Sequence, residues 1–436
     1  MSLSPATGLD ALPAYESLGL SGAGDGLEQF DHLAAYRSLG PIYQLRFRGE
    51  RWVAIGGMDA NEAAWRNPDQ WDYQEALSPF REMMGPTHVT QLDGDPHRRK
   101  RRNLKPGFAM SAVFGLIPAI DRSIAGDLRA SAGQSLNLHD FFMIALTRAN
   151  SRTVLHCDFD DVTAAAFIRF EEHFIRGTSM GEARHAHYAA PGFQADRALV
   201  FAFLGELVDR RLAGRTAADN FQAMLDERRE RGEPLDRDEL IPEAYLLLMA
   251  GTGNTAKLLN CGLQYLTEDP AWLDRLRAEL AGYAPEKLLG GMGAFPLLKA
   301  TLLEIERLFP AAPVLARVVA EPFEFHGHTL PKGTKVLHLQ TIPHFLEEIY
   351  ADPYRFDPAR WIDREYPKKS QGTFGGSTHL CLGINLVRLH MPIAIGNLLR
   401  DYELTLGERP RISVNVNYGV PQVADLAAVF RPRPPG

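Results

Sequence analysis

The chain has 436 residues, of which 45% are hydrophobic and 23% are charged, and its formal net charge is -7 at pH 7. This acidic balance argues against nucleic acid as the main partner, because proteins that bind nucleic acid usually carry a basic excess. No segment reaches the roughly 18 consecutive apolar residues of a membrane span, and the N-terminus lacks the pattern of a signal peptide. We therefore expect a soluble, cytoplasmic protein with no membrane span.

The sequence shows no Gly/Ser linker, low-complexity tract or internal repeat, so we expect one domain over residues 1–436. The three cysteines are Cys157, Cys261 and Cys381. Such a sparse, odd set cannot form a disulfide framework, and no CxxC pair suggests zinc. Cys157 follows an apolar run, and Cys261 lies within one. Both are therefore expected to be small residues of the core.

The first quarter mixes extended segments with one very basic helix. Residues 41–57 alternate apolar and polar side chains around a Gly-containing turn, which predicts a β-hairpin. Residues 95–108 begin a basic helix, and from about 112 to 285 the apolar spacing is mostly helical.

The longest expected helix runs from about Glu239 to Leu266, with Asp238 as its N-cap. It is apolar on every side near its middle, which is typical of a helix in the core of a large domain. Residues 251–255, GTGNT, are poor helix formers. They indicate either a local distortion beside a ligand or a close crossing of two helices.

The last third contains two further helices and a hairpin. We expect helices from Phe295 to Phe309 and from Asn385 to Leu399, and a hairpin over 323–339 that turns at Pro331-Lys332-Gly333. The stretch 341–372 reads as a long irregular loop, which is uncommon unless it serves a function. Short strands are expected after Asp401, and they carry no chemical signal.

Cys381 differs from the other cysteines because glycines surround it, in TFGGSTHLCLGIN over residues 373–385. Glycines permit tight turns and the close approach of a flat ligand. The N–H groups of a following helix lower the pKa of a thiol and favour the thiolate. A thiolate held in such a loop can ligate a metal from one side.

This segment resembles the haem-binding signature of the cytochrome P450 family, Phe-Gly-x-Gly-x-His/Arg-x-Cys-x-Gly. Five positions match and Ser377 replaces the second glycine; the matching residues are Phe374, Gly375, His379, Cys381 and Gly383. The family's Glu-x-x-Arg motif is similar to Glu304 and Arg307, and its arginine segment to residues 356–361 with Arg360. His344, followed by Asp352-Pro353, is similar to the turn that precedes the irregular loop in the family. All these matches follow the family's order over roughly residues 90–400.

The resemblance implies a mainly α fold with small β-sheets and haem b (iron protoporphyrin IX) as the cofactor. Cys381 would be the axial metal ligand, while Phe374 and Gly383 would shape its loop. The groups expected to hold the haem propionates are His97, Arg101, Arg317 and His379. Glu304, Arg307 and Arg360 are expected to form a buried structural network instead of taking part in catalysis.

Electrons are expected from NAD(P)H through separate partners of the ferredoxin or flavodoxin type, since the chain shows no Rossmann-type glycine fingerprint after a strand. Arg98, Arg99 and Lys100 are either a solvated basic face or part of a docking patch for such a partner. Both interpretations remain open from the sequence.

The central helix departs from the family's pattern. Monooxygenases of the family carry Ala/Gly-Gly-x-Asp/Glu-Thr there, whereas this chain has Gly253 at the acid position and Asn254 at the alcohol position. Three hypotheses follow: Asn254 orients water with Thr252 or Thr255, the substrate supplies its own hydroxyl or acid, or the enzyme uses peroxide or rearranges its substrate without activating dioxygen. The candidate catalytic residues are Gly251, Thr252, Asn254 and Thr255.

The predicted function is a monooxygenase that inserts one oxygen atom from O2 into an apolar small molecule, such as a terpenoid, steroid, fatty acid or aromatic metabolite. A non-catalytic haem protein that senses or carries a small molecule is the alternative from another class. Aromatic residues at helical spacing are more often plain core than pocket wall, and both interpretations apply here. The expected pocket walls are Phe167, Phe170, Phe174, Tyr188, Phe193, Leu247, Pro313, Val314 and Leu315. Residues 171–193 are polar and resemble a mobile lid.

Overall fold

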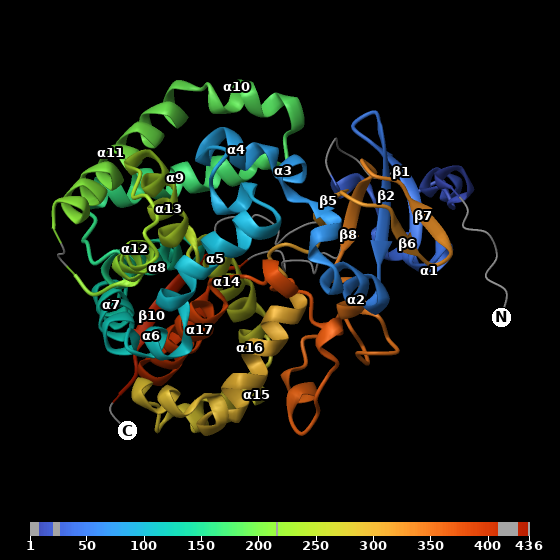
Figure 1. Cartoon of the computed structure of the whole chain (residues 1–436). Coiled ribbons are helices and arrows are strands. Elements are labelled where there is room, and N and C mark those ends of the chain that lie inside the picture. Colours follow the sequence, from blue (N-terminus) through green and yellow to red (C-terminus); the bar gives the residue numbers. More distant parts are fainter. Residues whose placement is uncertain (1–7, 21–26, 215–216, 409–425, 435–436) are drawn as a thin grey trace.

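The structure is a computed structural model that describes residues 8–20, 27–214, 217–408 and 426–434. Helices form most of it, as predicted, and strands β1, β2 and β5–β8 gather at one side of the helical body (Figure 1). Most buried apolar side chains belong to one core that runs through the helices and reaches strands β1 and β2. A second, smaller core lies against the sheet. The organisation as a single domain stays a prediction.

The elements are numbered in chain order. The α-helices are α1 (His32–Leu39), α2 (Met58–Arg66), α3 (Tyr73–Ala76), α4 (Ser78–Met84), α5 (Gly94–Phe108), α6 (Met110–Phe114), α7 (Ile117–Ala130), α8 (Leu138–Val154), α9 (Asp161–Thr178), α10 (Arg184–Tyr188), α11 (Pro191–Ala213), α12 (Asn220–Glu230), α13 (Arg237–Met249), α14 (Gly253–Thr267), α15 (Pro270–Leu280), α16 (Pro296–Leu308) and α17 (Ile384–Asp401). The strands are β1 (Ile42–Phe47), β2 (Glu50–Gly56), β3 (Trp71–Asp72), β4 (Ser135–Asn137), β5 (Leu315–Val319), β6 (Phe323–Phe325), β7 (His328–Leu330), β8 (Lys335–Leu339), β9 (Tyr402–Leu406) and β10 (Ala427–Pro432).

The largest sheet has five strands in the order β1-β2-β8-β5-β3. Its β1–β2 hairpin confirms the prediction for residues 41–57, and it turns at Arg48 and Gly49, which both have positive φ. Such a turn matches the right-handed twist of the flanking strands. The other sheets are β4-β10-β9 and the pair β6-β7.

The hairpin predicted over 323–339 is wrong in its pairing. Strand β6 pairs with β7 across a turn at His326 and Gly327, both with positive φ. Strand β8 leaves this pair and lies between β2 and β5 in the large sheet. Alternating hydrophobicity predicts a strand but does not identify its neighbour, so the turn at Pro331–Gly333 was read as a hairpin.

Most helix predictions are confirmed. The expected basic helix is α5, the two late helices are α16 and α17, and residues 341–372 contain only short 3-10 turns. Residues 171–193 are largely helical, because they contain the end of α9, α10 and the start of α11, and their role as a mobile lid stays a prediction. Within the tail, β9 and β10 are the expected strands, while residues 409–425 lie outside the described residues.

The long central helix predicted from Glu239 to Leu266 is wrong as a single element. It consists of α13, whose N-cap is Asp236 and not Asp238, and α14, with a break at residues 250–252. Gly251 has φ +99 at the break, a conformation that glycine adopts at little cost. The cluster of poor helix formers therefore ends one helix and begins another.

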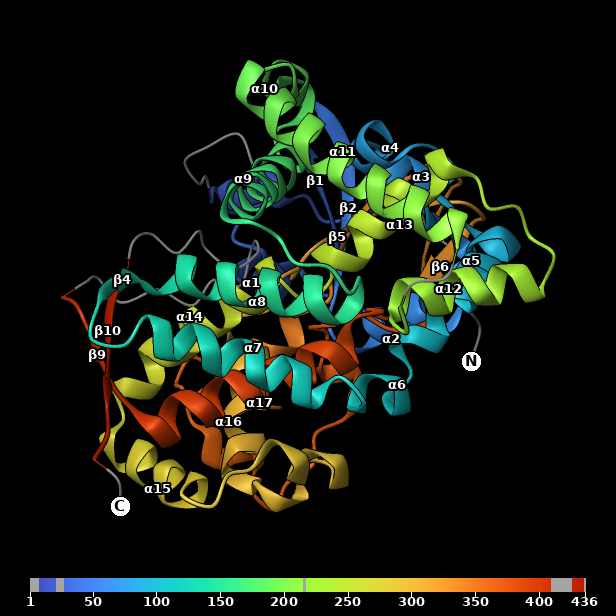
Figure 2. The same ribbon diagram turned by 90° about the vertical axis from the view of Figure 1, so that its left-hand side faces the viewer.

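Side chains from other elements satisfy the backbone of this break. The Asn150 amide on α8 donates to the carbonyl oxygens of Leu248 at 3.0 Å and Ala250 at 3.1 Å. The hydroxyl of Thr252 lies 2.9 Å from the Met249 carbonyl oxygen. Because buried backbone groups need partners, these contacts make the break a defined part of the fold. Helix α14 then packs against α8, α15, α16 and α17, which surround it in the helical body (Figure 2).

Across the described parts of the chain, no single helix combines the length and the apolar character that a membrane span requires. One bent pair, Gly94–Phe114 with Ile117–Ala130, meets the requirement by length and composition together, with a bend of 74°.

A buried ionic network joins α16 to the irregular loop, as expected. Arg307 forms two hydrogen bonds with the Glu304 carboxylate, at 2.8 and 2.9 Å, and Arg360 approaches the same carboxylate at 3.1 Å. The Trp361 indole N–H donates to it at 2.9 Å. Burial alone would raise the pKa of Glu304, but Arg307 and Arg360 hold it below its usual value.

His344 connects this network to the segment that leads to Cys381. Its Nδ1 lies 2.8 Å from the Arg307 carbonyl oxygen, and its Nε2 accepts the Gly372 N–H at 2.9 Å. The ring therefore carries its proton on Nδ1, and burial lowers its pKa to about 3. A neutral imidazole thus bridges the two regions with one donor and one acceptor.

We expect Glu304→Ala to destabilise the fold by about 3–5 kcal/mol, because it leaves two buried guanidinium groups without their carboxylate. Thermal unfolding by circular dichroism and the haem content of the purified protein measure the effect. Glu62→Ala, which removes an exposed carboxylate paired with Arg66 and Lys369, is the control and should change neither. Normal haem content and stability in Glu304→Ala would contradict the structural role.

Candidate functional site

The loop that carries Cys381 folds back on itself immediately before α17. The Cys381 N–H donates to the Phe374 carbonyl oxygen at 2.9 Å, and the Gly375 N–H donates to Gly372 at 3.0 Å. Gly375 has φ +69, so the turn requires a conformation that glycine provides. These bonds fix the cysteine backbone three residues before the helix begins.

The thiol itself is in a mixed environment. Solvent reaches Cys381, yet protein atoms crowd the sulfur on its other sides. This burial raises the pKa of the thiol, while the N–H groups of Gly383 and Ile384 and the charge of Arg101 act to lower it. The expectation of a lowered pKa is therefore wrong for the thiol alone, although the expected helix donors are present. Coordination by a metal deprotonates such a thiol outright.

The Cys381 loop touches the break in the central helix. A Cβ placed on Gly383 would lie 3.7 Å from the Ala250 Cβ. At Gly251 the nearest side chains are Leu386 and His390 of α17, and the His390 Nδ1 lies 3.4 Å from the Gly251 carbonyl oxygen. The cysteine loop, the first turns of α17 and the helix break thus form one packed unit.

Aromatic and basic side chains predicted to bind propionates come together beside this loop. The ring of His379 stacks on His97 at 3.9 Å and, on its other face, on Tyr73 at 3.7 Å. Arg317 lies over the Tyr73 ring at 4.5 Å. The sequence predicted the two histidines and Arg317 but missed Tyr73, which follows strand β3 and has no distinguishing local pattern.

Two guanidinium groups in this cluster lack an anionic partner. Arg317 is 6% exposed, and Arg101 is partly buried. Their Nη atoms donate to the carbonyl oxygens of Ala316 at 2.8 Å and Leu380 at 2.7 Å, and neither forms an ion pair within the described ranges. Their buried Nε atoms have no hydrogen-bond partner. Because a buried cation without a counter-charge is costly, this pair fits an anionic group such as two carboxylates of a bound cofactor.

The histidines are neutral near pH 7. Burial, together with Arg101 and Arg98, lowers the pKa of His97 to about 4. Burial, His97, Arg317 and Arg101 lower the pKa of His379 to about 2. The two rings can therefore present hydrogen bonds, while the arginines present charge.

Ser377 stands where the family signature has glycine. Its φ is +60, in the left-handed region that disfavours residues with a Cβ. The preceding Gly376 is fixed by packing, since a Cβ there would lie 2.4 Å from the Trp65 ring. The chain thus has its glycine one position early and a strained serine after it.

Comparison with known proteins agrees with this geometry. The cytochrome P450 family model matches residues 194–422, which is more than half of the chain. The chain belongs to the cytochrome P450 family. Members are haem-thiolate monooxygenases with a haem-iron cofactor and electron supply from redox partners, and this P450 shares that general chemistry.

Individual relatives are distant. A cyclooctat-9-en-7-ol 5-monooxygenase of Streptomyces melanosporofaciens is 27% identical over 399 residues, which cover 85% of this chain and 84% of the relative. Cytochrome P450 88A1 of Zea mays is 25% identical and covers 74% of this chain and 65% of its own. The solved structure of a retinoic-acid-bound cyanobacterial CYP120A1 has a TM-score of 0.81 at 22% identity, covering 99% of this chain and 100% of its own. That structure shows the P450 fold.

The predicted catalytic residues of this P450 surround the helix break but differ in exposure. Thr252 and Thr255 are fully buried, and the Thr255 hydroxyl has no hydrogen-bond partner. Asn254 is exposed, so its amide is available to a ligand or to water. Gly251 contributes the backbone conformation of the break and no side chain.

One contact at the break was missed by the sequence interpretation. The carboxyl group of Glu171 on α9 lies 2.9 Å from the Thr252 hydroxyl and 3.2 Å from the Gly253 backbone nitrogen. The signal that could have revealed it is position: Glu171 lies four residues after Phe167 and three before Phe174, on the buried stripe of α9. A carboxylate on an apolar stripe is rare unless it has a partner.

The predicted pocket walls divide into two groups. The aromatic residues pack ring to ring: Phe170 contacts Phe193 and Tyr245 at 5.2 Å, and Tyr188 stacks on Phe193 at 5.0 Å. These contacts favour the core interpretation. Val314 and Leu315, which are half-buried, remain candidates for contact with a substrate.

The basic residues of α5 are only partly available to a redox partner. Lys100 pairs with the buried Glu243 at 2.8 Å and with Glu239 at 3.6 Å. Arg98 bridges two exposed aspartates, while Arg99 is exposed. Lys100 therefore belongs to the fold, and the solvated-face interpretation is favoured for Arg98 and Arg99.

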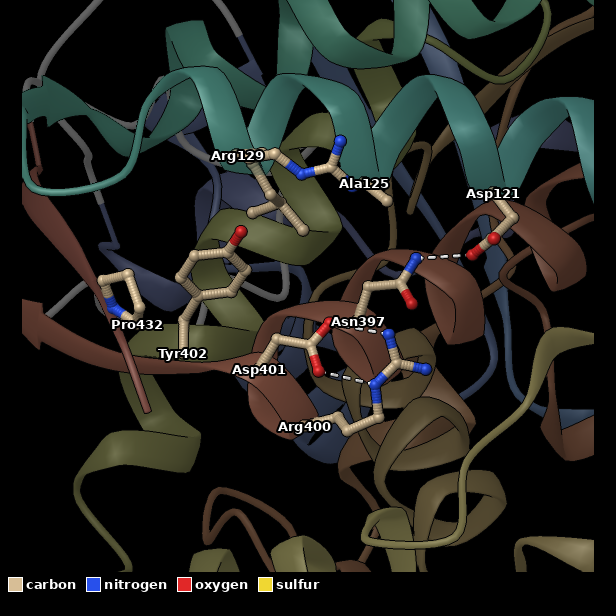
Figure 3. A pocket seen from close by; sticks show the side chains of 9 residues that line it. Asp121, Ala125, Arg129, Asn397, Arg400, Asp401, Tyr402 and Pro432 are labelled. Carbon is tan, nitrogen blue, oxygen red and sulfur yellow. Dashed lines mark hydrogen bonds and ion pairs between the residues drawn. The ribbon is translucent and has the colours of Figure 1, made fainter. Parts of the chain in front are cut away.

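A polar hollow of about 400 Å³ lies between α7, α17 and the C-terminal strands, away from Cys381 (Figure 3). Two interactions link its polar side chains: Asn397 donates to Asp121 at 2.7 Å, and Arg400 binds Asp401 at 2.6 Å. The hollow shares no lining residue with the cysteine loop or the helix break.

We expect Ser377→Gly to stabilise the P450 by about 1 kcal/mol, because glycine relieves the left-handed strain by more than its added entropy in the unfolded chain costs. Thermal unfolding measures the change. Ser377→Ala removes the same hydroxyl but keeps the Cβ, so it serves as the control and should give no gain. A lower melting temperature for Ser377→Gly would show that the serine side chain contributes contacts that outweigh the strain.

Proposed function

We propose that this P450 inserts one oxygen atom from O2 into an apolar small molecule. The observation that carries the proposal is a pair of guanidinium groups beside the Cys381 loop, the partly buried Arg101 and the buried Arg317. Both donate to backbone carbonyl oxygens, and neither forms an ion pair within the described residues. They supply charge for the two propionates of haem b, while His97 and His379 supply hydrogen bonds. Cys381 is the proposed iron ligand, and Phe374 and Gly383 shape its loop.

When bound, the thiolate-ligated haem supplies the activation of dioxygen. The net reaction consumes substrate, O2, two electrons and two protons, and it yields hydroxylated substrate and water. The protein's own residues must therefore bind the substrate, exclude bulk water and deliver protons. We propose NAD(P)H as the electron source, through a ferredoxin- or flavodoxin-type partner in the cytoplasm.

The apolar character of the substrate is supported by two relatives. One is named for action on cyclooctat-9-en-7-ol, and the other holds retinoic acid. Both compounds are mostly hydrocarbon, and Val314 and Leu315 offer half-buried apolar surface after α16. A terpenoid is the substrate class that these observations favour among the predicted ones.

Asn254 is proposed to orient water on the oxygen side. It occupies the family's alcohol position, it is exposed, and it follows directly after the helix break that touches the Cys381 loop. An amide can donate and accept hydrogen bonds but cannot easily relay a proton. Its role is therefore to hold water in place while another group supplies the proton.

The reduced protein should show a Soret band that carbon monoxide shifts strongly to the red, because an iron–thiolate bond produces this shift. Cys381→Ala should abolish the shift, whereas Cys157→Ala should keep it, since Cys157 lies in a different part of the fold. Absorbance after dithionite, with and without carbon monoxide, measures the band. An unshifted band in the wild-type protein would contradict thiolate ligation and favour a haem protein without this chemistry.

Asn254→Ala should lower the share of electrons that end in hydroxylated product by about tenfold, the effect of losing one hydrogen bond that holds a reacting water. Asn254→Thr should preserve or improve this coupling. NADH consumption and product formation, measured with surrogate redox partners and a substrate found by screening, give the ratio. Full coupling in Asn254→Ala would contradict the role and favour a substrate that supplies its own hydroxyl or acid.

A further inference from the structure

We propose that Glu171 on α9 supplies the acid that this P450 lacks on its central helix, and that it delivers protons at the break between α13 and α14. The inference rests on the proposed function, because proton delivery matters only if dioxygen is reduced. It assigns the missing acid to a residue 82 positions before Gly253 in the sequence.

The carboxyl group of Glu171 sits inside the break. It is 5% exposed, its Oε1 accepts the Gly253 N–H at 3.2 Å, and its Oε2 lies 2.9 Å from the Thr252 Oγ1. Gly253 is the first residue of α14, so the carboxyl group meets the free N–H end of this helix. Among the described residues, the Glu171 carboxyl group is the side-chain acceptor for the Gly253 N–H.

Glu171 occupies the space that a side chain at position 253 would need. A Cβ built on Gly253 would lie 2.5 Å from the Glu171 Oε1, well inside van der Waals contact. An acid at position 253 would thus displace the Glu171 carboxyl group from its observed place. The family pattern places its acid at position 253, and here a carboxyl group reaches the same place from another helix.

The hydrogen bonds around this carboxyl group accommodate a proton on it. The Thr252 hydroxyl has one proton, yet two acceptors lie 2.9 Å away, the Glu171 Oε2 and the Met249 carbonyl oxygen. If Glu171 is protonated, it donates to Thr252 and Thr252 donates to Met249, while the Glu171 Oε1 accepts from Gly253. Every donor then has an acceptor. In the ionised state the Thr252 hydroxyl donates to Glu171 instead, and the Met249 carbonyl oxygen keeps the Thr252 backbone N–H at 3.2 Å, so the same geometry accommodates the acid before and after it releases its proton.

Burial and the neighbouring charges bring the pKa of Glu171 close to neutral pH. Burial raises its pKa to about 7, partly offset by the hydrogen bond from Thr252, by Lys257 of α14 and by the Gly253 N–H, while Glu172 raises it further. On α13, burial and Glu171 hold the pKa of Tyr245 well above its usual value, so this phenol stays neutral. A group with a pKa near the working pH can both hold and release a proton.

The break also has the right position for this role. Ala250 touches Gly383 of the cysteine loop, and Asn254, the proposed water-orienting group, follows Gly253. In one delivery, protonated Glu171 gives its proton through the Thr252 hydroxyl to water held at Asn254, and the resulting carboxylate regains a proton from solvent. Two such deliveries provide the two protons that each turnover consumes. Glu171 acts through Thr252 and water, so it is a positioning and proton-supplying residue.

A purely structural role, in which Glu171 only fills space and caps α14, makes a different prediction. In Glu171→Gln the amide oxygen can accept from Gly253 and the amide nitrogen can donate to Thr252, which reproduces the bonds of the protonated acid. This variant therefore keeps the cap but has no proton to give. Glu171→Ala loses both properties, and Glu172→Gln removes the neighbouring, largely exposed carboxylate as a matched control.

The first measurement uses holoenzyme and does not depend on turnover. In wild-type protein an infrared band of a protonated carboxyl group should be present at pH 6 and lost by pH 8, and Glu171→Gln should lack it.

The pH dependence of stability also reports on Glu171. Because its pKa in the folded state is raised above the unfolded value, its contribution to stability falls as pH rises from about 4.5 to about 7. The wild-type melting temperature should therefore fall by about 2–4 °C more than that of Glu171→Gln across this window. A band or a pH dependence unaffected by Glu171→Gln would overturn the proposal.

The second measurement separates proton delivery from haem ligation. With NADH and a surrogate ferredoxin and reductase, Glu171→Gln should consume O2 at least tenfold more slowly than wild type and show a larger rate loss in D2O. Its carbon monoxide spectrum and its oxidation of guaiacol with hydrogen peroxide should stay within twofold of wild type, as should every property of Glu172→Gln. Equal O2 consumption and isotope effects in wild type and Glu171→Gln would overturn the role of Glu171.

Moving the acid provides the sharpest test. Gly253→Asp alone should lower the melting temperature, because the new side chain collides with Glu171, whereas Glu171→Ala with Gly253→Asp should recover both stability and O2 consumption relative to Glu171→Ala. A double variant as slow as Glu171→Ala would overturn the proposal. Wild-type protein that consumes no O2 above the Cys381→Ala background would instead contradict the proposed function itself, so the two failures are distinct.

Discussion

The break in the central helix is the constraint on which the rest of the site depends. A continuous helix would need no support at residues 250–252, but the interrupted one exposes backbone groups that α8, α9 and α17 each satisfy. The same interruption lets Ala250 meet Gly383, so the cysteine loop is packed against the point where the helix changes direction. Loop, break and flanking helices are therefore one interdependent structure.

A second constraint is electrostatic. Arg101 and Arg317 have no counter-charge among the residues that the structure describes, while Glu304 has two arginines and an indole around one carboxylate. The first arrangement suits recognition of an anion, and the second suits a permanent structural network. Chemically similar residues thus serve binding in one place and folding in another, and the presence of an internal partner is what distinguishes them.

The sequence predicted the fold class, the first hairpin, helices α5, α16 and α17 and the members of the Glu304 network, because these depend on local periodicity or on motifs with fixed spacing. It did not predict the pairing of β8, since a strand pattern does not identify its neighbour. Tyr73 and Glu171 were also missed. Each acts through contacts with residues far away in the chain, His379 and Gly253. Tyr73 carries no local signal of its contact, whereas the place of Glu171 on the buried stripe of α9 indicates that it has a partner but does not identify it.

The close approach of Glu171 to the Cα of Gly253 has a consequence for the history of the family. Because the Glu171 carboxyl group fills the space that a side chain at position 253 would need, the two positions are coupled. A carboxyl group that reaches this place from position 171 favours glycine at position 253, and an acid at position 253 favours a residue at position 171 that leaves the space empty. Related sequences should therefore show paired substitution at these sites, and a motif search confined to the central helix would misread such chains as lacking an acid.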